Sequence, residues 1–175
     1  MAMHLAFEVD IGSDLETVFS WLATPEKAKI WMTSVSETEI IDEKPGMVGT
    51  TFRERVEEGG GGIDMRGSVT AFAQDRQISF HLESRVHRLD VDYRVGVVGD
   101  LVRLTVTSDV HWRFPVNVAS VFFGGTIKRK IVEQSEQELA RLKELCEAGT
   151  RKGEARGAVC KDLLDPDRLD ADRDA

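Results

Sequence analysis

Cysteine and long apolar runs are scarce in this sequence, and each shortage excludes a class of protein. The two cysteines, Cys146 and Cys160, stand in different contexts and do not form the framework of a disulfide-rich secreted domain. No segment approaches the roughly 18 consecutive apolar residues that a membrane-spanning helix requires. The first residues also lack the basic segment and apolar run of a secretory signal. We therefore expect a cytoplasmic protein without integral membrane contact.

Basic residues are in the minority. The 175 residues include 23 Lys and Arg against 31 Asp and Glu, which gives a formal net charge of -8. This negative excess opposes the sequence-independent attraction to phosphate backbones on which nucleic-acid binding relies, so we expect no nucleic acid among the partners. A chain of this length with 41% hydrophobic residues suits one globular domain, and a homodimer is compatible with these properties.

Strand patterns dominate the first two thirds of the chain. Residues 3–11 alternate apolar and polar side chains, and residues 34–113 are nearly all of strand type, with turn signals between the segments. The later strands place apolar residues on one side and charged or hydroxyl side chains on the other. This pattern is typical of an antiparallel sheet that is covered on one face only.

Two short helices are expected after the first strand. Ser13 and Glu16 form the signature of a capping box at the start of the first helix. Pro25 suits the first turn of the second helix, with Thr24 as its N-cap, and this helix is expected to end near Trp31.

One long amphipathic helix follows the strands. We expect it to begin with Asn117 as its N-cap and to run to about Ala148, with Gly149 as its C-terminal cap. Its apolar face has the helical spacing of four and three residues and consists of Ile127, Ile131, Leu139, Leu142 and Cys146. Cys146 is expected to be a small buried side chain, with a reactive thiol as the alternative.

The last residues differ in composition from the rest. Residues 150–175 contain no aromatic side chain, and the last fifteen include six aspartates. A segment of this kind buries too little apolar surface to offset the entropy of ordering. We therefore predict a folded domain over residues 1–149 and a charged, disordered tail over residues 150–175.

The element order predicts the architecture. A strand, two short helices, six strands and a long helix indicate an α+β protein, in which a twisted antiparallel sheet of about seven strands curls around the terminal helix. The curvature of a sheet and the radius of a helix do not match perfectly. We therefore expect a hollow between them, lined by apolar side chains and suited to a small molecule.

The same order resembles a known family. The segments "VDIGSDLETVFSWLATPEKAKIWM", "KPGMVGTTFRERV" and "ARLKELCEA" look like those of the START-related helix-grip superfamily (SRPBCC), which includes polyketide cyclase/dehydrase-like proteins, lipid-transfer proteins and the plant pollen-allergen fold. The resemblance covers residues 3–148 and implies a helix-grip fold with a small hydrophobic ligand. It does not fix the function, because members include cyclases, lipid binders and co-chaperone activators.

Glu54 is the main polar candidate for the hollow. If Phe52 points inward, then Val48, Thr50, Glu54 and Val56 share its side of the strand. A carboxyl group among apolar side chains has a raised pKa unless it is paired, and it can then act as a general acid or base. Alternatively, Glu54 lies at the solvent end of the strand beside an arginine. A register shift by one residue would instead turn Arg53 and Arg55 inward.

Tyr93 is the second candidate for chemistry, and it is the only tyrosine. It lies on the apolar side of its strand, where its hydroxyl needs a partner, and Ser108 on the following strand is placed to supply one. The positions of Tyr93 and Ser108 are equally consistent with contacts to a ligand. Further residues are candidates for the wall of the hollow, and the alternative for each is simple packing in the hydrophobic core. They are Trp31, Phe52, Met65, Phe80, Val106, Trp112 and Phe122.

No metal or cofactor is expected. The histidines His4, His81, His87 and His111 show no ligand spacing, and the serines lack the context of a catalytic triad.

Three functions remain open from the sequence. The first is binding or transport of a small hydrophobic or aromatic molecule, lipid-like or polyketide-like. The second is an aromatase/cyclase-type enzyme, in which Glu54 or Tyr93 moves protons during aldol closure and dehydration. The third is a protein-interaction domain. A carrier predicts apolar walls with one or two polar anchors, an enzyme predicts converging ionisable groups, and an interaction domain predicts a filled interior with an exposed apolar patch.

Overall fold

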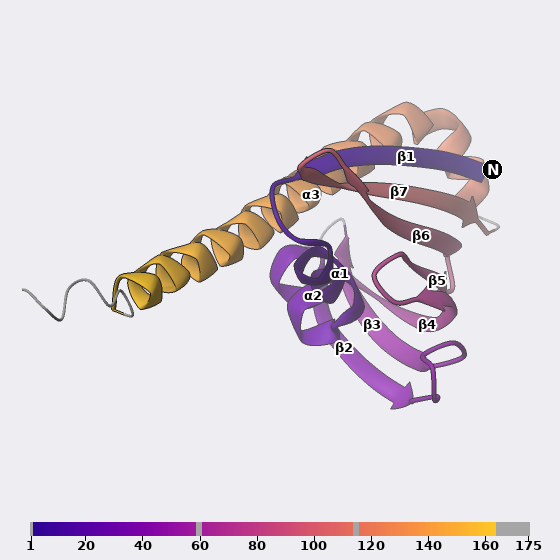
Figure 1. Ribbon diagram of the computed structural model, residues 1–175. Coiled ribbons are helices and arrows are strands. Elements are labelled where there is room, and N and C mark those ends of the chain that lie inside the picture. Colours follow the sequence, from indigo (N-terminus) through magenta and orange to yellow (C-terminus); the bar gives the residue numbers. More distant parts are fainter. Residues whose placement is uncertain (1, 59–60, 114–115, 164–175) are drawn as a thin grey trace, which may run out of the picture.

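The computed structural model describes residues 2–58, 61–113 and 116–163, except for the side chains of 58, 116–124, 127 and 151–163. Seven strands and three helices follow one another along the chain (Figure 1). They are β1 (Ala2–Ile11), α1 (Leu15–Ala23), α2 (Pro25–Trp31), β2 (Val35–Asp42), β3 (Thr51–Glu58), β4 (Gly61–Ala73), β5 (Gln77–Glu83), β6 (His87–Val98), β7 (Leu101–Trp112) and α3 (Val116–Leu163).

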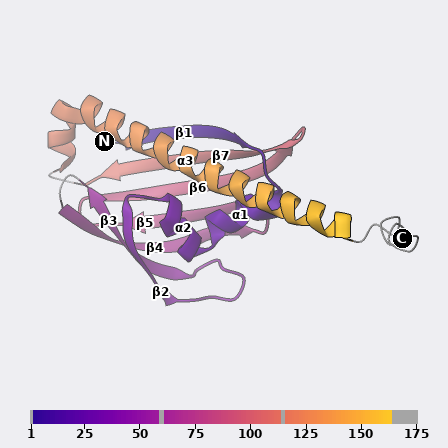
Figure 2. The same ribbon diagram turned by 90° about the vertical axis from the view of Figure 1, so that its left-hand side faces the viewer.

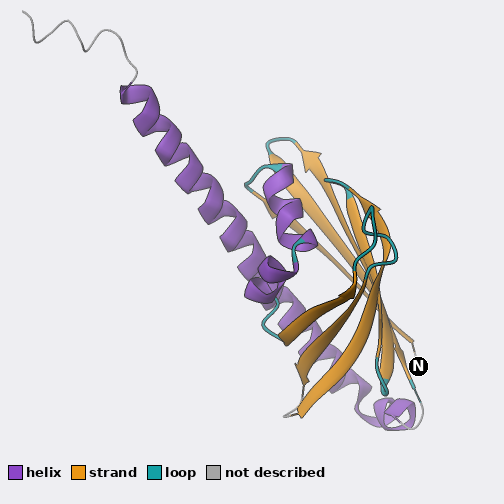
Figure 3. Ribbon diagram, turned by 90° about the horizontal axis from the view of Figure 1, so that it is seen from below, coloured by secondary structure: helices purple, strands orange, loops and turns teal. Residues whose placement is uncertain are grey.

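The strands form one open antiparallel sheet. Their order is β1-β7-β6-β5-β4-β3-β2, so that β1 and β2 are the two edges. Figure 2 shows α3 passing along the sheet near β1, with α1 and α2 beside it, and Figure 3 shows the curvature of the sheet seen from below. This arrangement confirms the predicted helix-grip fold.

The core lies where α3 meets the concave face of the sheet. Three residues of α3, Leu139, Leu142 and Cys146, are buried against strand residues of the same cluster, among them Ile11 and Leu104. The predicted apolar face of the helix is therefore correct over its described part, while the side chain of Ile127 lies outside it. Cys146 has no exposed surface and is a free cysteine.

The capping residue of α1 differs from the prediction. Asp14 is the N-cap, and its carboxylate accepts hydrogen bonds from the backbone N–H and the hydroxyl of Thr17, both at 2.7 Å. Ser13 instead lies 2.7 Å from the hydroxyl of Thr150 on α3. Asp14 outcompetes Ser13 because its carboxylate reaches two donors at once. The second helix begins at Pro25 after Thr24, as predicted.

The predicted boundaries of the long helix are wrong. The helix begins at Val116, so Asn117 lies within its first turn, and it continues through Gly149 to Leu163. Gly149 does not adopt the positive φ of a C-terminal cap. Half of the residues from 150 to 163 are Arg, Lys, Glu or Ala, which have high helix propensity. The division into a domain of residues 1–149 and a tail of residues 150–175 stays a prediction.

Candidate functional site

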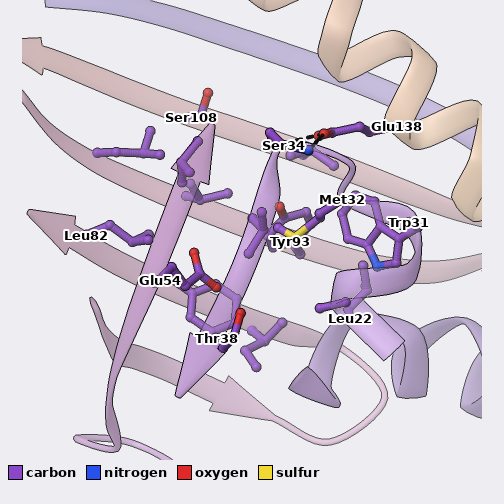
Figure 4. Close-up of a pocket in the computed structure, with 18 of the residues that line it drawn as sticks. Leu22, Trp31, Met32, Ser34, Thr38, Glu54, Leu82, Tyr93, Ser108 and Glu138 are labelled. Atoms are coloured by element: carbon purple, nitrogen blue, oxygen red, sulfur yellow. Dashed lines mark hydrogen bonds between the residues drawn. The ribbon is translucent and has the colours of Figure 1, made fainter. Parts of the chain in front are cut away.

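A cavity of about 300 Å³ lies between the concave face of the sheet, α2 and the middle of α3 (Figure 4). Apolar side chains from nearly every element border it, including Leu22 of α1, Trp31 of α2 and Leu139 of α3. The cavity exists because the helix rests on one end of the curved sheet and leaves the neighbouring part of the concave face uncovered.

Four aromatic rings follow one another along the wall of this cavity. The ring centroids of Trp31 and Tyr93 are 6.3 Å apart, those of Tyr93 and Phe80 are 6.2 Å apart, and those of Phe80 and Phe52 are 5.7 Å apart. All three contacts are edge-to-face, the arrangement that aromatic quadrupoles favour. Trp31 is further fixed by its indole N–H, which donates to the carbonyl of Trp21 at 3.0 Å.

The position of Phe52 depends on a glycine in the neighbouring strand. Phe52 of β3 pairs directly with Gly67 of β4, and a Cβ atom built on Gly67 would overlap the Phe52 ring. The missing side chain therefore lets the ring lie flat across β4. An aromatic ring over a strand glycine in this way also compensates for the packing that the glycine lacks.

Glu54 borders the cavity, as the inward register of β3 predicts. It pairs with Thr38 of β2 and Met65 of β4, and Figure 4 shows Glu54 and Thr38 on adjacent strands at the pocket. The alternative register is excluded, because Arg55 reaches Asp64 at 3.1 Å and neither Arg53 nor Arg55 borders the cavity.

The carboxyl group of Glu54 has no hydrogen bond or ion pair with any residue that the structure describes. Burial therefore acts on it without compensation and raises its pKa to about 7. Near neutral pH the group is divided between the acid, which donates a hydrogen bond, and the carboxylate, which only accepts.

Tyr93 lies across the same cavity. Burial raises the pKa of its hydroxyl well above the ordinary value, and the nearby carboxylates of Glu54 and Glu138 add to the shift. The hydroxyl is therefore neutral at physiological pH. Ser108 also borders the cavity, but no hydrogen bond joins Ser108 to Tyr93 in the described part of the chain, so of the two alternatives, pairing and ligand contact, the pairing is not present.

The structure brings together most of the predicted site residues. Those that border the cavity are Trp31, Phe52, Glu54, Phe80, Tyr93, Val106 and Ser108. Met65 does not border it and packs in a smaller buried cluster with Phe52 and Leu82. Trp112 does not border it either, since its ring packs on His87 with centroids 5.1 Å apart near the far end of β7. The side chain of Phe122 lies outside the described residues.

Sequence reasoning missed several polar residues of the site, and two of them illustrate why. Thr38 borders the cavity opposite Glu54, and the hairpin register of β2 and β3 is the signal that would have found it. Glu138 of α3 accepts hydrogen bonds from the backbone N–H and the hydroxyl of Ser34, both at 2.9 Å, and from the hydroxyl of Thr33 at 3.2 Å. No local signal indicates this contact, because its partners lie more than 100 residues apart in the sequence.

No group of three or more His, Cys, Asp or Glu side chains within residues 2–58, 61–113 and 116–163 is placed to hold a metal ion. No described helix is both long and apolar enough to cross a bilayer.

Comparison with known proteins agrees with this architecture. The sequence matches the family described as "Polyketide cyclase / dehydrase and lipid transport" over residues 3–147. A comparison with curated proteins finds no significant match.

Solved structures share the fold at low sequence identity. The TTHA0849 protein from Thermus thermophilus has a TM-score of 0.72 and 16% identity, covering 85% of this chain and 99% of its own. The Zhui aromatase/cyclase from Streptomyces sp. R1128 has a TM-score of 0.72 and 14% identity, covering 84% and 94%. A START superfamily protein from Mycobacterium smegmatis has a TM-score of 0.68 and 21% identity, covering 84% and 99%. These likenesses show the fold alone. Because the family match extends over most of the sequence, the chain belongs to the polyketide cyclase/dehydrase and lipid-transport family.

Proposed function

We propose that the protein binds, and carries, a small hydrophobic or aromatic molecule in the cavity between the sheet and α3. The observation that carries the proposal is the cavity itself, about 300 Å³ of space with mostly aromatic and aliphatic walls. Ligand sites are typically concave, largely apolar and supplied with a few polar groups that set orientation. Glu54, Tyr93 and Ser108 would be such groups here.

The volume of the cavity favours a compact ligand. A space of about 300 Å³ is at the lower end of the range for ligand pockets. A molecule of a few rings fits this space better than a long-chain lipid. The aromatic series from Trp31 to Phe52 offers ring edges and faces against which such a molecule would stack.

A cyclase-type enzyme is the second candidate, and one specific observation favours it. Glu54 and Tyr93 border the same cavity, and the pKa of Glu54, about 7, lies near neutral pH, where a general acid or base is most effective. In an aldol closure, the Glu54 carboxylate would remove a proton from a carbon beside a ketone, and the neutral Tyr93 hydroxyl would donate a hydrogen bond to the oxygen that gains negative charge. The solved aromatase/cyclase shares only the fold.

The cavity weighs against the third function, a protein-interaction domain. That function predicts an interior filled by side chains, whereas here the space beneath α3 is open. We therefore keep the carrier and the enzyme as the candidates.

The test begins with the purified protein. Native mass spectrometry should detect a co-purifying small molecule, or the protein should bind the uncharged fluorescent probe N-phenyl-1-naphthylamine with one site per chain. Ser108→Phe should abolish probe binding, because the new ring would occupy the cavity. Thr107→Phe is the matched control, since residue 107 points to the opposite face of the same strand.

The outcomes are distinct. Equal loss of binding in both variants, or equal retention, would contradict a ligand site in this cavity, provided that thermal unfolding shows both to be folded. Turnover of a poly-β-keto substrate that disappears in Glu54→Gln, while probe binding persists, would favour the enzyme over the carrier.

A further inference from the structure

The charges around the cavity are of one sign. The ionisable side chains that border it, besides Tyr93, are Glu54, Glu57 and Glu138, and no Lys, Arg or His among the described residues does so. Two cations that lie close in sequence to lining residues are already paired. Arg55 contacts both Glu57 at 3.4 Å and Asp64 at 3.1 Å, and Lys27 donates to the hydroxyl of Ser20 at 2.7 Å. A negatively charged ligand would therefore enter this space without a counter-charge, at a high desolvation cost.

The three carboxyl groups differ in what they contact. Glu138 accepts hydrogen bonds from Ser34 and Thr33. Glu57 lies 3.4 Å from the Arg55 guanidinium and accepts from Ser36 at 3.3 Å. Glu54 has no such partner in the described chain. Of the three carboxyl groups, Glu54 is the one whose oxygens accept no hydrogen bond and face an apolar space. These oxygens need a donor, which a ligand could supply.

The aromatic walls also favour a positively charged ligand. Trp31, Tyr93, Phe80 and Phe52 all border the cavity. The face of an aromatic ring carries negative potential and attracts an ammonium group within about 6 Å of its centroid. Carboxylates combined with several aromatic rings form the usual surroundings of a bound ammonium ion.

From these two independent features we infer that the ligand of this cavity is a hydrophobic amine, whose protonated nitrogen pairs with Glu54, and not a hydrophobic acid. The inference rests on the proposed function, because it names the chemical class of the ligand for the same cavity.

The inference predicts a dependence on pH. The strand neighbours of Glu54 are Thr38 from β2 and Met65 from β4, the other ionisable groups that border the cavity are Tyr93, Glu57 and Glu138, and none of them carries positive charge. Since the pKa of Glu54 is about 7, the carboxylate that an ammonium needs is a minor form at pH 6 and the major form at pH 8. Amine affinity should therefore rise roughly tenfold over this interval.

Three probes that differ in one group test the inference: 2-naphthylmethylamine, 2-naphthalenemethanol and 2-naphthoic acid. Calorimetric titration of the full chain at pH 8 should give the tightest binding for the amine, about tenfold weaker binding for the alcohol and no measurable binding for the acid. At pH 6 the amine and the alcohol should bind about equally.

Two variants test whether Glu54 is responsible for the preference for the amine. Glu54→Gln should remove the preference for the amine at pH 8 and leave the affinity for the alcohol within about threefold of its original value. Glu39→Gln on the neighbouring strand β2 is the control, and it should preserve the preference, because Glu39 is exposed and does not border the cavity.

The failures of the two proposals are distinguishable. If the acid binds as tightly as the amine, or if Glu54→Gln keeps the preference for the amine, the inference is overturned while a ligand site remains. If the amine and the alcohol bind equally at pH 8, the inference is likewise overturned. If none of the three probes binds and no molecule co-purifies, the proposed function fails and the inference fails with it.

Discussion

Glu138 and Ser34 join the long helix to the start of β2 at the edge of the cavity. One carboxylate oxygen of Glu138 accepts from both the backbone N–H and the hydroxyl of Ser34, each at 2.9 Å, as the dashed lines in Figure 4 indicate. The contact spans 104 positions in the sequence. It holds α3 against the segment that connects α2 to the sheet, and both residues border the cavity.

Removing this contact should weaken the fold. Glu138→Ala is expected to lower the free energy of unfolding by about 1–3 kcal/mol, because the bonded donors of Ser34 and Thr33 lose a charged acceptor. Glu138→Gln should lose less stability, since the amide oxygen of the glutamine can still accept these hydrogen bonds. Urea denaturation measures both. Glu136→Ala, at an exposed position of the same helix, is the control, and an equal loss there would show that the contact contributes nothing specific.

Glu54 should make the stability depend on pH in a recognisable direction. Its pKa is raised from 4.5 to about 7 in the fold, so the folded state favours the neutral acid. The stability that this preference contributes is complete below pH 4.5 and is lost as the pH rises through 7. Glu54→Gln should therefore gain stability relative to the original protein between pH 4.5 and pH 8, by at most about 3 kcal/mol.

Denaturation curves of both proteins across this pH range provide the measurement. Glu57→Gln, an exposed neighbour on β3, serves as the comparison and should show no similar gain. A constant difference between Glu54→Gln and the original protein at all pH values would mean that the carboxyl group is not desolvated as described.

Gly67→Ala should disturb both stability and binding. The new methyl group would overlap the ring of Phe52, which must then leave its place over β4. We expect a loss of about 1–3 kcal/mol in the free energy of unfolding and weaker binding of aromatic probes. Gly96→Ala is the control, because a Cβ atom there meets nothing within 4 Å.

A double-mutant cycle identifies the cause. Combined with Phe52→Leu, the Gly67→Ala change should cost less than it does alone, because the smaller side chain leaves space for the methyl group. Strictly additive losses would show that the overlap with Phe52 is not the reason.

Cys146 should be inert in the folded protein. Its side chain has no exposed surface, and burial raises the pKa of its thiol to about 12. In a Cys160→Ser background, a disulfide reagent such as DTNB should label no thiol until urea unfolds the chain. Rapid labelling of the folded protein would restore the reactive-thiol alternative.

The strand periods predicted the sheet, but they placed Glu54 inward only on the condition that Phe52 points inward, and the solvent end of the strand stayed open as the alternative. The same argument could not exclude the shifted register that turns Arg53 inward, since a slip of one residue inverts every position. The structure decides between them, because Glu54 borders the cavity and neither Arg53 nor Arg55 does.

The failures of prediction have physical reasons as well. Gly149 suggested a helix end, but a glycine acts as this kind of C-terminal cap only where its backbone turns to positive φ, which Gly149 does not do, and the helix continues to Leu163. Trp112 has the correct alternation for the cavity, yet it lies too far along β7. Alternation gives the face of a sheet and says nothing of the position along it, which the placement of α3 determines.

The two edges of the open sheet have a consequence for contacts between molecules. The exposed edge of β2 carries acidic side chains and two register irregularities, and the backbone of β1 is held by α3, whose Lys143 donates to the carbonyl of Asp10 at 2.8 Å. The β2 edge therefore offers no long, regular and uncharged run of backbone groups to a strand from another chain. Concentrated solutions of the folded protein should resist strand addition at this edge, the step that seeds fibrous aggregates.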